Sequence, residues 1–156
     1  MSDFSFLKDY ILPSAKQEDR QKLSHFKHFL FRVDESIITT ADTALNIPLE
    51  LKNFYQEIGY GFFFQQRRSS NNTFLSPDSF KIINLRQEYY EFDPDLELYE
   101  SYPDKLIFFE VNEGVYLLID KEDNKGKNAI YYFDEKIADS LEEFLRRFDA
   151  EGHYFE

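Results

Sequence analysis

The spacing of apolar residues near the start of the chain predicts two helices. Residues 4–12 form the first candidate, which Pro13 ends, and residues 17–33 form the second. Apolar residues recur at i, i+3, i+6 and i+7 in the second segment, which predicts one buried stripe along a helix. That stripe consists of Leu23, Phe26, Phe29 and Leu30.

Two further helices are predicted before residue 60. Thr39 or Thr40 can cap a short helix that reaches Leu45. Pro48 then suits the first turn of a new helix, because its missing N–H has no partner to lose there. Gly59 suits the position just after that helix, since glycine turns left-handed without a Cβ clash. The apolar face of this helix comprises Ile47, Leu51, Phe54, Tyr55 and Ile58.

Apolar runs without helical spacing predict strands. Phe62, Phe63 and Phe64 directly follow Gly61, and such a run in a strand implies cover on both faces, so we expect it near the centre of a sheet. Residues 73–76 form a short strand. Three later runs read as strands, the first two joined by a tight turn at 112–114: residues 105–111, 114–120 and 128–134.

The remaining segments complete the expected topology. Ser76 and Pro77 predict a helix start, with Phe80, Ile83, Tyr90 and Leu85 as its apolar residues. Residues 92–104 are expected to form a long loop, and residues 136–149 a closing helix. The expected fold class is α+β, one domain with a central, mainly antiparallel sheet flanked by helices. The closing helix repeats helical spacing at Ile137, Leu141, Phe144, Leu145 and Phe148.

Charge narrows the function classes. The chain of 156 residues has a net charge of −12, and residues 86–123 hold twelve acids against three bases. Such a field repels nucleic-acid phosphates and anionic lipid, and it attracts a basic partner. A solvated acidic face that only aids solubility is the alternative. No run is long and apolar enough to cross a membrane, and the chain lacks cysteine and a secretion signal, so a cytoplasmic setting fits best.

Candidate chemistry is sparse. His25 and His28 stand three residues apart, without a third ligand at a convincing spacing, and read as part of a helix surface; His153 is expected to be exposed in the tail. Counted from Asp120, a calcium-binding loop requires glycine at position six and glutamate at position twelve, but these positions hold Lys125 and Tyr131. No phosphate-binding or nucleophile motif occurs. We therefore expect no catalytic, cofactor or metal site.

The order of the motifs resembles the SUKH superfamily, which includes bacterial toxin-immunity proteins and fungal regulators of cell-wall synthesis. The resemblance covers about Ile47 to Phe148 and rests on five segments in order. They are the proline-led helix "IPLELKNFYQEIG", the junction "FLSPDSF", the strand "LIFFEV", the glycine hairpin "NEGVYLLID" and the helix "IADSLEEFLRRF".

The resemblance implies a non-enzymatic domain that binds a protein partner, most often a toxin. We expect a single domain over 1–156, with the motif-bearing part at about 36–150 and a helical extension at 1–35. A regulatory domain acting on a housekeeping partner, or an enzyme with an unrecognised site, are the alternatives. A basic toxin surface would be met by the acidic loop, whose candidate contact residues are Asp93, Asp95, Glu97, Tyr99, Glu100 and Tyr102.

Overall fold

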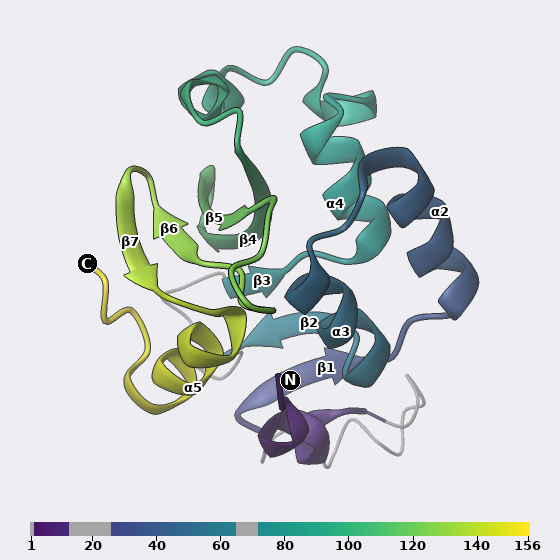
Figure 1. Ribbon diagram of the computed structural model, residues 1–156, viewed down its shortest axis with the longest axis vertical. Coiled ribbons are helices and arrows are strands. Elements are labelled where there is room, and N and C mark those ends of the chain that lie inside the picture. Colours follow the sequence, from purple (N-terminus) through teal and green to yellow (C-terminus); the bar gives the residue numbers. More distant parts are fainter. Residues whose placement is uncertain (1, 13–25, 65–71) are drawn as a thin grey trace.

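A single antiparallel sheet organises the molecule. A computed structural model describes residues 2–12, 26–64 and 72–156, and within them seven strands pair in chain order, each with the next (Figure 1). The expected α+β fold class is thereby confirmed. The strands are β1 (His28–Phe31), β2 (Tyr60–Phe63), β3 (Asn72–Phe74), β4 (Lys105–Asn112), β5 (Val115–Asp120), β6 (Ile130–Tyr132) and β7 (Glu135–Ala138).

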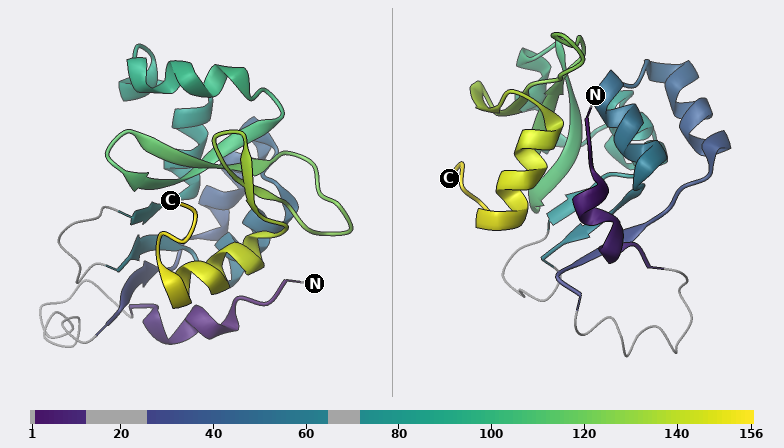
Figure 2. Two further views of the ribbon diagram at one scale, coloured as in Figure 1. Left: turned by 90° about the vertical axis from the view of Figure 1, so that its left-hand side faces the viewer. Right: turned by 60° about the horizontal axis from the view of Figure 1, so that its bottom comes forward.

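Within the described ranges, four α-helices and three 3-10 helices accompany this sheet. Ser76 caps α4 through its Oγ, which accepts a hydrogen bond from the N–H of Ser79, and Pro77 fills the first turn as predicted. Figure 2 shows η1 beside α5. The helices are η1 (Ser5–Tyr10), α2 (Glu35–Leu45), α3 (Leu49–Glu57), α4 (Pro77–Asn84), η2 (Glu88–Tyr90), η3 (Pro94–Ser101) and α5 (Leu141–Glu151).

Helices α3 and α5 cover the same face of the sheet. Phe74 of β3 is paired with Phe109 of β4, so both side chains point to this face. The Phe54 ring of α3 stacks on Phe74 with centroids 4.1 Å apart, and Phe148 of α5 meets Phe109 at 5.4 Å. Aromatic rings from both helices and several strands therefore form one continuous core.

The glycines before the phenylalanine run let β1 approach β2. Gly59 and Gly61 have φ of +129° and +154°. A Cβ on Gly59 would lie 1.8 Å from the carbonyl oxygen of Phe31, and one on Gly61 would lie 2.1 Å from that of Phe29. Strand β2 lies between β1 and β3, second from one edge of the sheet rather than near its centre. Its alternating burial leaves one face only partly covered, so the expectation of cover on both faces was wrong.

Several sequence predictions were wrong. Residues 28–31 form β1 rather than a helix, so Phe29 and Leu30 point to opposite faces; Leu23 lies outside the described residues. Helix α4 ends at Asn84, which leaves Leu85 exposed and places Tyr90 in η2. Residues 135–138 form β7, so the last helix begins only at 141, after the cap Ser140.

Candidate functional site

The candidate surface consists of residues 88–104 and lies at the end of the molecule opposite η1 (Figure 1). Residues 88–104 contain seven acids and no base. Residues 92–104 were expected to form a long loop, but η3 occupies most of that stretch, and η2 lies just before it. Pro94 starts η3, and the Asp93 carboxylate caps it by accepting a hydrogen bond from the N–H of Asp95 at 3.0 Å.

A three-residue repeat sorts the side chains of η3. In a 3-10 helix, residues i and i+3 lie above one another. Leu96 and Tyr99 are buried, and Tyr102 just beyond the helix is half-buried. Glu97 and Glu100 belong to another row and are exposed. The structure therefore brings the acidic candidates to the surface and turns the tyrosine row toward the sheet.

Tyr99 fastens η3 to the sheet. Its side chain is 5% exposed, and its hydroxyl oxygen accepts a hydrogen bond from the N–H of Tyr116 at 2.8 Å. Burial raises the pKa of this hydroxyl. The ring also stacks on Phe133, with centroids 5.8 Å apart. Among the six candidate residues, Tyr99 thus holds the surface in place from below.

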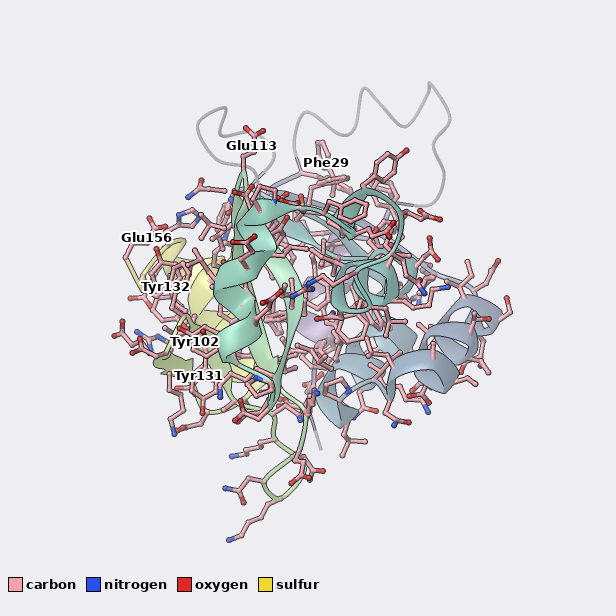
Figure 3. The ribbon with its side chains drawn as sticks, turned by 90° about the horizontal axis from the view of Figure 1, so that it is seen from above. Phe29, Tyr102, Glu113, Tyr131, Tyr132 and Glu156 are labelled. Atoms are coloured by element: carbon pink, nitrogen blue, oxygen red, sulfur yellow. The ribbon has the colours of Figure 1, made fainter. Side chains whose placement is uncertain are left out.

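The face of the sheet opposite α3 and α5 carries a further acid, Glu110 of β4. Strand register aligns Phe29, Phe62, Thr73 and Glu110 across β1 to β4 on the face opposite α3 and α5, and all four are half-buried. Burial raises the pKa of Glu110, and the charges of Glu113 and Asp93 raise it further. Figure 3 shows Glu113 at the edge of the molecule, at the tip of the β4–β5 hairpin.

Sequence reasoning missed the most exposed apolar side chains of this surface. Tyr89 is 88% exposed, Phe92 87% and Leu98 64%. Each lies next to an acid in the sequence. The available signal was an apolar residue placed between acids, in a stretch with neither helical nor strand periodicity.

The prediction that His28 lies on a helix surface was wrong, because this residue is buried in β1. Its Nε2 lies 2.6 Å from the Asp149 carboxylate, and its Nδ1 accepts a hydrogen bond from the N–H of Phe64 at 3.1 Å. Burial lowers its pKa, and the hydrogen bond to Asp149 opposes this shift. His153 is partly buried against Asn72, while His25 lies outside the described residues.

Two depressions lie elsewhere on the described part of the chain. One, of about 530 Å³, lies at the start of α5 and is lined by Glu50, Lys125, Lys127 and Arg146, among others. Glu50 is buried there, with both oxygens engaged by hydrogen-bond donors. Within residues 2–12, 26–64 and 72–156, no group of three or more histidine and carboxylate side chains could hold a metal ion. In the same ranges, no helix has the length and apolar character to span a bilayer.

The fold defines a single-domain α+β protein whose antiparallel sheet is fully covered on one face only. The chain belongs to the SMI1 / KNR4 family (SUKH-1), whose model matches residues 33–147. It is 41% identical over 135 residues to a protein of Bacillus subtilis (strain 168) named immunity protein YxxD, a match that covers 85% of this chain and 90% of that protein. No solved structure is significantly similar to the chain.

Proposed function

We propose that the chain is an immunity protein that binds a cognate toxin and neutralises it without chemistry of its own. The observation that carries this proposal is the 41% identity to immunity protein YxxD over most of both chains. The acidic surface over residues 88–104 supports a partner with a basic face. A nuclease domain has such a face, because binding phosphate requires cationic side chains.

Protection from a toxin is the direct test. A candidate toxin domain from the genome that encodes this chain is expressed in a host that lacks both genes, with and without this chain. We expect growth to recover only when the chain is present, and the two purified proteins to form a complex. Failure of the chain to bind or protect would overturn the proposal.

The contribution of the acids is tested by charge reversal. Replacing Asp93, Asp95, Glu97 and Glu100 by lysine should slow association and flatten or invert its dependence on salt more than neutral substitutions do, because the lysines repel a cationic partner and salt screens that repulsion. A matched control makes the same change in net charge away from the candidate surface. Unchanged affinity in the first variant would remove these acids from the interface. The control replaces Asp9, Glu35, Glu57 and Glu122 by lysine.

A regulatory role on a housekeeping partner is the second reading of this family. Deleting the gene in a strain that also lacks the toxin gene separates the two. An immunity protein is then dispensable, whereas a regulator of a housekeeping partner leaves a growth or cell-wall defect.

A further inference from the structure

Two aromatic rings stand out from the candidate surface with almost no cover. Tyr89 and Phe92 are 88% and 87% exposed, whereas the exposed apolar residues elsewhere, Ile37 and Leu49, reach 40% and 46%. Large apolar side chains gain favourable free energy when they leave water, so fully exposed aromatics on a folded segment mark a contact surface. Aromatic residues are also enriched among the side chains that dominate binding energies.

These rings are presented by a fixed frame. Arg86 and Glu88, which precede Tyr89, both adopt left-handed backbone conformations, with φ of 56° and 52°. Phe92 directly precedes Asp93, which caps η3, and η3 is fastened by the buried Leu96 and Tyr99. A surface that is already ordered loses less conformational entropy on binding.

The surrounding charges identify the partner. Glu88 and Glu91 flank the two rings, and Asp95 and Glu97 follow in η3. Among the ion pairs of the described residues, none engages these four acids. A second copy of this chain would bring like charges together at this surface. A protein rich in arginine and lysine satisfies the acids, and its guanidinium groups can also lie over the aromatic faces.

We propose that Tyr89 and Phe92 are the anchor residues of an interface with a cationic protein surface, and that Glu88 and Glu91 steer its approach. The inference rests on the proposed function, since that cationic protein is the toxin. The two roles separate kinetically. Buried anchors control dissociation, whereas charges around them control the association rate and its dependence on salt.

Surface plasmon resonance with the toxin domain that the protection assay identifies tests the assignment. Tyr89→Ala with Phe92→Ala should raise the dissociation rate by at least about 30-fold, with the association rate within about threefold of the original. Glu88→Gln with Glu91→Gln should mainly lower the association rate and flatten its salt dependence. The matched control, Ile37→Ala with Leu49→Ala, removes exposed apolar groups from α2 and α3 and should change neither rate by more than about twofold. Unchanged melting temperatures establish that the variants are folded.

The outcomes separate this inference from the proposed function. If the chain binds and protects but the double aromatic variant dissociates like the original, the anchor assignment is overturned and the proposed function stands. If the chain itself neither binds nor protects, the proposed function fails first. If sedimentation velocity shows a dimer that the double aromatic variant loses, a second copy occupies the surface and the cationic-partner assignment is wrong.

Discussion

At the scale of single residues, Glu50 ties three distant parts of the chain together. Its Oε1 accepts hydrogen bonds from the N–H groups of Asn128 at 2.5 Å and Leu141 at 3.0 Å, and its Oε2 accepts one from the Ser2 hydroxyl at 2.6 Å. The N–H of Glu50 in turn donates to the Asn128 side-chain oxygen. One buried carboxylate therefore joins α3, the loop before β6, the start of α5 and the N-terminal segment.

Glu50→Gln is expected to destabilise the protein. The amide nitrogen cannot accept a hydrogen bond, so at least one buried donor loses its partner, at a cost of about 2–3 kcal/mol in the free energy of unfolding. Urea unfolding followed by circular dichroism measures the change. The matched control is Glu135→Gln, at an exposed position of β7, expected within about 0.5 kcal/mol of the original. Equal stabilities for the two variants would contradict a structural role for Glu50.

His28 makes stability depend on pH. The N–H of Phe64 points at Nδ1, so the folded protein holds this histidine neutral, and burial lowers its pKa below the ordinary 6.5; Asp149 opposes the shift and Lys27 adds to it. As the pH falls below about 6.5, the unfolded chain takes up the proton first. The contribution of His28 is thus complete above pH 6.5 and is lost as the pH falls toward the folded pKa.

We expect the free energy of unfolding to fall between pH 7 and pH 5.5, by at most about 1.4 kcal/mol per pH unit from this one group. His28→Gln should be less stable at pH 7 and should lose this part of the pH dependence. A free energy of unfolding that rises over the same interval would show that the Asp149 interaction outweighs burial.

At the scale of elements, the close contact between β1 and β2 requires glycine, which has no side chain, at position 59. Gly59→Ala places a Cβ 1.8 Å from the Phe31 carbonyl oxygen at φ of +129°, so β1 must move or detach. The matched control is Gly126→Ala, which is also at positive φ (+84°) but has open space around it. We expect losses of more than about 3 kcal/mol for Gly59→Ala and about 1 kcal/mol for Gly126→Ala in urea unfolding. Similar losses in both variants would mean that backbone conformation alone, and not the close approach, sets the cost.

Sequence patterns predicted elements well where local chemistry decides them. The starts of α3 and α4 and the β4–β5 hairpin follow from Pro48, Pro77 and the turn before Val115. Strand β1 was misread because an inward position is occupied by His28, which a hydrophobic pattern counts as polar.

The candidate surface was only partly predictable for a related reason. The inward row Leu96, Tyr99 and Tyr102 repeats every three residues, which matches neither the helix nor the strand pattern. Its acids could be recognised from composition, since charged side chains remain in solvent unless they are paired. The exposed positions of Tyr89 and Phe92 follow left-handed backbone conformations at Arg86 and Glu88. Neither position holds glycine, asparagine or aspartate, so the sequence does not predict these conformations.

At the scale of the whole molecule, the net charge of −12 acts on stability as well as on binding. Repulsion among excess acids favours the expanded chain, and salt screens it over about 10 Å at 0.1 M. The surface ion pairs act in the opposite direction, but each contributes at most about 1 kcal/mol. The sign of the salt effect therefore reports which of the two prevails.

We expect the melting temperature to rise between 10 and 300 mM NaCl, by about 2–4 °C for each 1 kcal/mol of repulsion that is screened. Replacing Glu88, Glu91, Glu97 and Glu100 by glutamine changes the net charge from −12 to −8, and should raise the melting temperature at low salt and reduce its rise with salt. Lys125→Gln with Lys127→Gln brings the charge to −14 and should enlarge that rise. Chloride is the appropriate anion, because sulfate stabilises folded proteins by exclusion from their surface. A melting temperature that falls with NaCl would mean that ion pairs outweigh the excess charge, and that the acids of η2 and η3 are kept at no cost to stability.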